Sequence, residues 1–523
     1  MKIFRFIFLG FIPLFLLISS ASAQKGGLLR GEISSKDYDF IYFIPLSENG
    51  LMTIEHSLKF RTSTDNWEIN LYSKNLQHLQ HKKFTTGPGH KLIEYYDDKD
   101  SLFYGFFAEK GGSRKYEVLK FNYLNGKVSK IVSFGDSRMS YEHFDMVGST
   151  QFVSGIRNPN SGAYFGQALF TLTLVPVIWG IKIYNEPVQI FYNDFKTGNK
   201  GKIQPVTKGE CTVFATKANP KSGVYALIIK NIYKKKASIK YFEYDKNGKE
   251  IRHTELEGLN EKNLLSGSLI IVNDSTFAFV GTYNNDERRK MNSNNSALGM
   301  FVSTIVNGKE SIIKFHPFSE FTNAKKALDF RNLKRFEESK RKGENIDLGF
   351  KLLMHQDIIQ MDSVYVLLSE SYFPEYHFET YNNFYGSMYS DQVFDGYRFS
   401  HAITAGFNNQ GDLLWDNIFK ISDIISYNLD ENVIVYFDGT TQVMLYYADG
   451  IIYSKVISGN KIIYKKDETE VQTVGDNERV LYENYGKIYH WYGPYFLLTG
   501  FQQVMDDRGK RRKVYFFLKL KFG

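Results

Sequence analysis

The sequence predicts an all-β protein, a β-propeller of about seven four-stranded blades with one short helical insertion. Three observations lead to this prediction. Short runs of alternating apolar residues that end in turn residues fill the chain, whereas helical periodicity is nearly absent. Several of these runs share one pattern and recur at similar spacings, as in repeat proteins. Aromatic residues make up 16% of the chain, with 36 Tyr and 44 Phe, and such side chains suit the pleated surface of a sheet.

The first 23 residues have the layout of a secretory signal peptide. Lys2 and Arg5 form a basic start, an apolar run covers residues 6–18, and residues 21–23 form an A-x-A cleavage site. The run is shorter than the ~20 residues that span a bilayer, and no Cys follows it to carry a lipid anchor. We therefore expect a protein exported to the periplasm, or to the cell surface or extracellular space, with residues 24–523 as its mature chain.

Composition restricts both the partners and the source of stability. The formal net charge is +8, and removing Lys2 and Arg5 lowers it by two to +6. Because the other basic residues are mostly scattered, nucleic-acid binding is not expected. Cys211 is the single cysteine, so no intramolecular disulfide can form, and a buried thiol is expected. Residues 161–181 carry no charge, but polar residues and β-branched residues favour buried strands, so no transmembrane segment is expected after signal cleavage.

The repeated pattern is a polar turn followed by alternating apolar residues that mostly reach a Gly or Ser. Good copies begin at Asp100, Ser149, Asp274, Asp362 and Gly493, and weaker copies begin near residues 211 and 431. Most intervals between these starts are 49–69 residues, and the one interval of 88 residues contains an insertion. The pattern therefore indicates about seven similar units.

Tight turns follow most of these starts. They read Asn125-Gly126, Asn247-Gly248, Asn307-Gly308 and Gln410-Gly411. Asn-Gly between alternating strands is a strong hairpin signature, because the primed turn needs positive φ. Each unit is therefore expected to hold about four antiparallel strands, and radial repetition of such sheets is a β-propeller. We expect the strand at residues 514–518 to close the ring with an early strand such as residues 40–44.

The segment Gly411-Asp412-Leu413-Leu414-Trp415 resembles the Gly-x-apolar-apolar-Trp segment of quinoprotein-type propeller repeats. It does not match the Asp-box of sialidase-type propellers, whose Trp falls three residues after the Gly and not four. The other repeats of this chain lack the Trp. The resemblance therefore implies the architecture alone, and no cofactor is expected.

Two other all-β folds stay open. Alternating apolar residues from Phe516 to Phe522 end the chain, as in an outer-membrane β-barrel, although strands apolar on both faces, such as residues 277–280, suit a doubly covered sheet. Tandem β-sandwiches are the other alternative, and the lack of Pro-rich or Ser-rich linkers disfavours them.

The first insertion, residues 317–349, contains the best helical pattern of the mature chain. Asn323 is expected to cap a helix over residues 323–342. Eight basic and three acidic residues lie between residues 325 and 342. A solvated helix across the rim is favoured, and a basic arm for an anionic partner is the alternative.

The second insertion, residues 372–399, holds eleven aromatic residues in 28 positions. Tyrosines bind partners well, because the ring is large and stiff and ends in a polar group. A packed, extended hairpin is nevertheless the favoured interpretation, and a surface for a ligand or partner is the alternative. The candidate contact residues for a protein or glycan partner are Tyr376, Tyr381, Tyr385, Tyr389 and Tyr397.

Local motifs for chemistry are absent from the sequence. There is no His-Glu-x-x-His helix, no Gly-x-Ser-x-Gly elbow and no phosphate-binding glycine loop. His78 and His81 would face opposite sides of a strand. We therefore predict neither catalytic nor metal-binding residues, and expect a monomeric, non-enzymatic binding or scaffold protein of the cell envelope. A carbohydrate-active hydrolase or lyase with carboxylates around the propeller axis is the alternative, and an outer-membrane barrel is the second.

Overall fold

The structure of the protein is a computed structural model. It describes residues 29–58, 64–109, 116–131, 139–157, 188–207, 209–233, 236–285, 296–328, 330–342, 348–356, 358–361, 364–382, 388–422, 424–437, 441–459 and 461–521. The predicted signal peptide and residues 161–181 lie outside these ranges. Within them, none of the helices has the length and apolar composition needed to cross a membrane.

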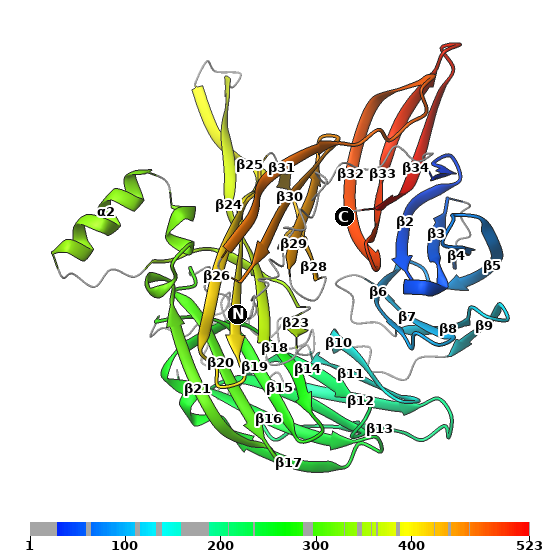
Figure 1. Ribbon diagram of the computed structural model, residues 1–523. Coiled ribbons are helices and arrows are strands. Elements are labelled where there is room, and N and C mark those ends of the chain that lie inside the picture. The colour runs from blue at the N-terminus through cyan, green and yellow to red at the C-terminus, as the bar shows by residue number, and fades with distance from the viewer. Residues whose placement is uncertain are drawn as a thin grey trace, which may run out of the picture.

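Eight antiparallel sheets, here called blades 1 to 8, account for nearly all of the described chain (Figure 1). Blade 1 is β2 (Tyr38–Pro45), β3 (Leu51–Ser57), β4 (Asp65–Tyr72) and β5 (His78–Thr86). Blade 2 is β6 (His90–Asp97), β7 (Leu102–Glu109), β8 (Glu117–Asn122) and β9 (Lys127–Ile131). Blade 3 is β10 (Met139–Val147), β11 (Thr150–Arg157), β12 (Val188–Asp194) and β13 (Lys200–Ile203). Blade 4 is β14 (Glu210–Asn219), β15 (Val224–Tyr233), β16 (Lys236–Asp245) and β17 (Glu250–Glu255).

The second half of the chain continues the series. Blade 5 is β18 (Asn263–Asn273), β19 (Thr276–Asn284), β20 (Gly299–Val306) and β21 (Lys309–Pro317). Blade 6 is β22 (Leu352–Met354), β24 (Val364–Asn382), β25 (Met388–Asn408) and β26 (Leu413–Lys420), with β23 (Ile359–Met361) on β24 and β27 (Ile425–Ser426) on β25. Blade 7 is β28 (Ile434–Phe437), β29 (Gln442–Ala448), β30 (Ile451–Ser458) and β31 (Lys461–Glu470). Blade 8 is β32 (Glu478–Tyr492), β33 (Tyr495–Asp506), β34 (Arg511–Lys521) and β1 (Arg30–Ser34).

The sequence pattern located seven of these eight blades. The five good copies of the repeat are all second strands of their blades, β7, β11, β19, β24 and β33, and the two weaker copies are the first strands β14 and β28. Blade 1 has no copy, because buried polar residues interrupt the apolar alternation of β3. There Thr53 donates a hydrogen bond to Glu55 at 2.6 Å, and Asn70 donates another at 2.8 Å. The predicted count of about seven is therefore one too low for the described chain.

The predicted tight turns share one position in the repeat. Each of the four joins the third strand of its blade to the fourth, in blades 2, 4, 5 and 6. Gly126, Gly248, Gly308 and Gly411 have φ between 68° and 76°. Asn307 also has positive φ, as a primed turn requires. These turns confirm that the units are four-stranded.

Ring closure uses an earlier strand than predicted. β34 pairs with β1, in the register Arg30↔Leu518 to Ser34↔Val514. The expected pairing with residues 40–44 is wrong, because those residues belong to β2, which is already paired with β3 in blade 1. β1 has no such sheet of its own and completes blade 8 as its outer strand.

Most of the described apolar core lies in eight layers, one between each pair of neighbouring blades, and a small further cluster surrounds Val504 in blade 8. Phe152 of blade 3, for example, stacks on Tyr225 of blade 4 with ring centroids 4.5 Å apart, and Cys211 is buried in the same layer, as predicted. The layer between blades 8 and 1 contains Phe517 and Leu51. Because the series of layers returns to its start, the fold is a β-propeller and not a string of β-sandwiches.

The first insertion is helical, as predicted, but it begins differently. The short 3-10 helices η3 (Phe318–Glu320) and η4 (Ala324–Ala327) precede the helix α2 (Phe330–Arg341), which extends to one side in Figure 1. Asn323 makes no capping hydrogen bond with its side chain. The carboxylate of Asp416 in β26 instead accepts the N–H groups of Thr322, Asn323 and Ala324 at 2.7–2.8 Å. Two more 3-10 turns, η1 (Ser47–Asn49) and η2 (Glu257–Glu261), complete the helical elements of the described chain.

Candidate functional site

The second insertion is a long two-stranded hairpin, made by the outer parts of β24 and β25. The two strands stay paired as far as Asn382↔Met388. Figure 1 shows them projecting well beyond the body of the ring. Of the described chain, only β27 pairs with this part of the hairpin, at Tyr397 and Arg398. The insertion is thus extended, as one interpretation of the sequence expected, but most of it is not packed.

Register divides the side chains of the hairpin between two faces. Directly paired residues of an antiparallel ladder share a face, and alternate pairs lie on opposite faces. One face, here the aromatic face, carries the pairs Tyr372/Phe399, Pro374/Tyr397, Tyr376/Phe394 and Phe378/Gln392. The other, here the charged face, carries Phe373/Arg398, Glu375/Gly396, His377/Val393, Glu379/Asp391 and Tyr381/Tyr389. A bulge at Glu375/Tyr376, where Asp395 is the extra residue, keeps the rings of both strands on the same face.

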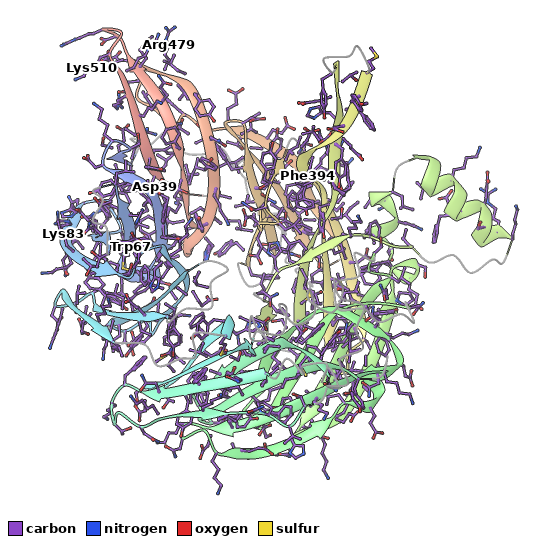
Figure 2. All side chains as sticks on the ribbon, turned by 180° about the vertical axis from the view of Figure 1, so that it is seen from behind. Asp39, Trp67, Lys83, Phe394, Arg479 and Lys510 are labelled. Atoms are coloured by element: carbon purple, nitrogen blue, oxygen red, sulfur yellow. The ribbon has the colours of Figure 1, made fainter. Side chains whose placement is uncertain are left out.

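The aromatic face continues the core layer between blades 6 and 7 out into solvent. At its base, Phe399 is 1% exposed and Tyr372 and Tyr397 pack against the layer. Phe394, labelled in Figure 2, lies 5.0 Å from Tyr397 and 5.5 Å from Tyr376, measured between ring centroids. Exposure then rises outward, to 46% for Tyr376 and 71% for Phe378. The face therefore changes along its length from core to accessible apolar surface.

The charged face is dominated by carboxylates. Arg398 donates two hydrogen bonds to Glu375, both 2.9 Å long. His377 donates from Nδ1 to Asp395 at 2.5 Å and from Nε2 to Glu379 at 3.2 Å. The hydrogen bond to Asp395, and then that to Glu379, raises the pKa of His377, because both stabilise the imidazolium. Together with Asp391, this face has four carboxylates, one guanidinium and the imidazolium of His377.

The predicted contact residues do not form a single cluster. Tyr376 and Tyr397 lie on the aromatic face, and Tyr397 is half-buried at its base. Tyr381 and Tyr389 oppose each other on the charged face, and Tyr385 lies outside the described residues.

Sequence reasoning missed three members of the aromatic surface. Phe378 and Phe394 lie in the same insertion as the candidate tyrosines, so the alternation of strand positions offered a signal for both. Tyr427 is 71% exposed and lies 6.2 Å from Phe394, between ring centroids. It comes from the segment after β27, and no local pattern linked it to the hairpin.

A second group of titratable residues is partly buried where blades 3 and 4 meet. Thr216 of β14 donates a hydrogen bond of 2.5 Å to Asp145 of β10. Burial raises the pKa of Asp145 and lowers that of the neighbouring His143. Burial also raises the pKa of Glu142 to about 7. Asp145 and His143 are partly exposed on the first strand of blade 3 and interact with β14 of blade 4, so they belong to the contact between these two blades.

Metal-binding geometry does not occur in the described part of the chain. No group of three or more His, Cys, Asp or Glu side chains there is arranged to hold a metal ion. The hairpin, with its two chemically different faces, is therefore the best candidate for a functional surface.

The ring of blades and the projecting hairpin define the protein as a β-propeller with one elongated blade. Sqt1 from Chaetomium thermophilum is similar, with a TM-score of 0.41, 10% identity and coverage of 94% of this chain and 100% of that chain. Apo prolyl oligopeptidase B from Galerina marginata has a TM-score of 0.39, 10% identity and coverage of 91% and 57%. The chain spans 50% of a prolyl endopeptidase and 52% of the acylaminoacyl peptidase of Pyrococcus horikoshii. No protein-family model and no curated protein matches the sequence.

Proposed function

We propose that this chain is an exported, non-enzymatic binding or scaffold protein of the cell envelope, which holds a partner on the aromatic face of its hairpin. One observation carries the proposal: the apolar surface of Tyr376, Phe378 and Tyr427 is exposed beyond the ring, with the partly buried Phe394 in contact with Tyr376 and Tyr427. Export is supported by the signal-peptide layout of residues 1–23.

Exposure of the aromatic face to water costs free energy unless a partner covers its rings. A two-stranded hairpin without a covering layer is at best marginally stable in water. Contiguous exposed apolar surface on a soluble protein marks interaction sites, and aromatic anchors contribute most of the energy at such sites. The hairpin therefore has the properties of a contact element whose rings become buried on binding.

Two partner chemistries fit the face. A protein partner would bury the rings of Tyr376 and Phe378 in an apolar pocket of its own. A glycan would stack the C–H faces of its sugars on the same rings, while the Tyr376 hydroxyl binds sugar hydroxyls. We favour a protein partner, because Phe378 is the most exposed described ring of the face's paired residues and has no polar group to offer a sugar.

Replacing the exposed rings tests the proposal. The mature wild-type chain is immobilised, and ligands are identified from an envelope extract of the source cells and from a glycan panel. A Tyr376→Ala/Phe378→Ala variant is expected to bind the identified ligand at least ~10-fold more weakly, since each anchor ring contributes about 1–2 kcal/mol or more. Its thermal unfolding midpoint is expected to stay close to that of the wild type, because both rings are exposed.

A matched control removes two exposed rings elsewhere. Tyr482 and Tyr485 on blade 8 are 51% and 77% exposed. A Tyr482→Ala/Tyr485→Ala variant should bind as the wild type does. Unchanged binding by the hairpin variant, or turnover of a glycan into products, would contradict the proposal.

A further inference from the structure

The hairpin of blade 6 and the end of blade 8 project to the same side of the ring. The hairpin connects β24 to β25, and the end of blade 8 connects β33 to β34, so both join the second strand of a blade to the third. Repetition of the blade therefore places them on one side. Figures 1 and 2, which are opposite views, both show these two ends as the highest described parts of the molecule. Blade 7 lies between them, since it shares one core layer with blade 6 and another with blade 8.

The end of the hairpin is uncharged on both of its faces. The sequence of residues 380–390 contains no charged side chain. The hairpin tip is defined here by Tyr381, Met388 and Tyr389, which are 46%, 76% and 52% exposed. The two tyrosines oppose each other on the charged face, whereas Met388 belongs to the next pair and lies on the aromatic face. Surroundings that cover both faces of the hairpin therefore fit this tip better than a pocket on one side.

Carboxylates begin further down the hairpin. Glu379 pairs with Asp391 two positions below the tyrosine pair, which is about 7 Å along the strands. Three of the four carboxylates on the charged face have a partner within the hairpin: Arg398 for Glu375, and His377 for Glu379 and Asp395. The tip can therefore enter a thin surface layer before the charged residues reach it.

The end of blade 8 is basic. The basic tip is defined here by five exposed side chains: Arg479, Arg508, Lys510, Arg511 and Lys513. Within the described chain, none of these five has a carboxylate as an ion-pair partner. Figure 2 shows Arg479 and Lys510 at the top of the blade. These charges are therefore available to an anionic partner.

Nearby carboxylates reduce the charge of the basic tip but do not cancel it. Asp506 accepts two backbone N–H groups of its own turn, and Asp476 accepts the side-chain amide of Gln472. Asp507 is exposed in the turn. The adjacent ion pairs are balanced and join Glu32 and Glu478 to Arg30 and Arg512. Five cations against three carboxylates leave an excess of two positive charges.

We infer that this side of the molecule docks on a phospholipid bilayer, with the hairpin tip in the headgroup region and the basic tip on lipid phosphates. Tyrosine favours the membrane–water interface, where the ring is covered and the hydroxyl stays hydrated. Lys and Arg near an anionic bilayer are attracted to it. The unpaired edges of the hairpin keep the tip at the interface, because unpaired backbone groups cost too much free energy in hydrocarbon.

The shape of a bilayer also fits the two projections. A bilayer is flat and wide, so one surface contacts both tips, although blade 7 separates them. The inference does not rest on the proposed function. Phe378 pairs with Gln392, one position below Glu379, and Tyr376 lies further down. The aromatic face therefore stays outside the bilayer and accessible to a partner.

Flotation with protein-free vesicles tests the inference. The mature chain is expected to float with vesicles of phosphatidylcholine and phosphatidylglycerol, and more weakly with phosphatidylcholine alone, because only the anionic lipid attracts the basic tip. Tyr381→Ser/Tyr389→Ser is expected to bind both kinds of vesicle at least ~10-fold more weakly, because interfacial binding scales with the apolar area that becomes buried. A wild-type chain that binds neither kind, or binds only membranes that contain protein, would overturn the inference.

A second variant tests the basic tip separately. Arg511→Gln/Lys513→Gln is expected to lose at least ~10-fold in binding to the mixed vesicles and to bind phosphatidylcholine alone as the wild type does. Two control variants change the third-to-fourth turns, which lie on the opposite side of the ring. Leu124→Ser and Lys246→Gln/Lys249→Gln remove exposed residues there and should float normally. Wild-type binding by both tip variants, with all chains folded by thermal unfolding, would contradict the inference.

Amide exchange locates the contact on the molecule. With mixed vesicles, exchange is expected to slow in peptides that cover the hairpin tip and residues 506–511, and to stay unchanged in residues 246–249. Slower exchange only in other parts of the chain would mean that a different surface binds the vesicles. Tyr376→Ala/Phe378→Ala should float as the wild type does, so loss of partner binding with intact flotation separates this inference from the proposed function.

Discussion

Individual buried carboxylates hold the connections of this propeller in place. Glu370 of β24 is fully buried and accepts hydrogen bonds from the N–H groups of Asn432 and Val433 at 2.7 and 2.8 Å. His355 Nε2 also lies 2.8 Å from this carboxylate. Burying a charge is costly unless hydrogen bonds satisfy it, and here several do. Glu370 therefore joins blade 6 to the start of blade 7, as Asp416 joins blade 6 to the helical insertion.

Glu142 is the contrasting case, because its environment opposes ionisation. Its Oε2 is buried without a hydrogen-bond partner among the described residues, and burial raises its pKa from 4.5 to about 7. Between these two pH values the folded chain holds a proton that the unfolded chain has lost. The free energy of unfolding is therefore expected to fall as pH rises through this window. Above pH 7 the whole loss is present, because Glu142 is ionised in both states.

A Glu142→Gln variant is expected to remove the loss of stability that ionisation of Glu142 causes. Its free energy of unfolding should match that of the wild type near pH 4.5 and exceed it by roughly 1–3 kcal/mol at pH 8.5, as a shift of this size implies. Urea unfolding at the two pH values measures the difference. A gap that is the same at both pH values would show that the carboxyl does not titrate in this window.

At the scale of elements, β24 and β25 combine a structural half with an exposed half. Their inner halves form the middle of blade 6, and their outer halves form the hairpin. The same alternation of side chains continues through both. The two halves differ in what packs against them. Blade 7 covers the base of the hairpin, and none of the described blades covers its tip.

Two phenylalanines of this element are expected to differ in their contribution to stability. Phe399→Ala should lower the free energy of unfolding by about 3–5 kcal/mol, because Phe399 is buried in the layer between blades 6 and 7. Phe378→Ala should change it by less than ~0.5 kcal/mol, because the ring is exposed. Chemical denaturation of both variants measures the contrast. A large loss for Phe378→Ala would show that the outer hairpin is packed in solution.

At the scale of the whole molecule, stability depends on closing the ring between the two ends of the described chain. β1 adds Ile33 to the layer between blades 8 and 1. Its Glu32 accepts hydrogen bonds of 2.8 and 2.9 Å from Arg512, and its Arg30 donates one of 3.0 Å to Gln502. These contacts span almost the full length of the sequence.

Removing β1 is therefore expected to open the last blade. A chain that starts at residue 36 should unfold at a lower temperature than one that starts at residue 29. Amide exchange should increase most in β34, which loses its outer partner. Hydrogen–deuterium exchange of the two chains makes the comparison. Equal protection of residues 511–521 in both would mean that β1 does not close the ring.

Much of the fold was predictable because the relevant signals are local. Apolar alternation in second strands such as β19, and the Asn307-Gly308 turn, require no knowledge of distant residues. The sequence pattern did not locate blade 1, because polar Thr53 and Glu55 occupy buried positions of β3. Their hydrogen bonds to each other and to Asn70 stabilise them there.

The candidate site was predictable only as a segment. Its aromatic composition singled out residues 372–399, but a single bulge at Asp395 determines which rings share a face, and Tyr427 joins them from outside the segment. Local sequence patterns alone determine the four-stranded unit and its repetition. They also predict the export signal. The tertiary structure decides the blade count, the partner of β34, the use of Asp416 as a cap and the division of the hairpin into two faces. These depend on contacts between residues far apart in the chain, which no local pattern records.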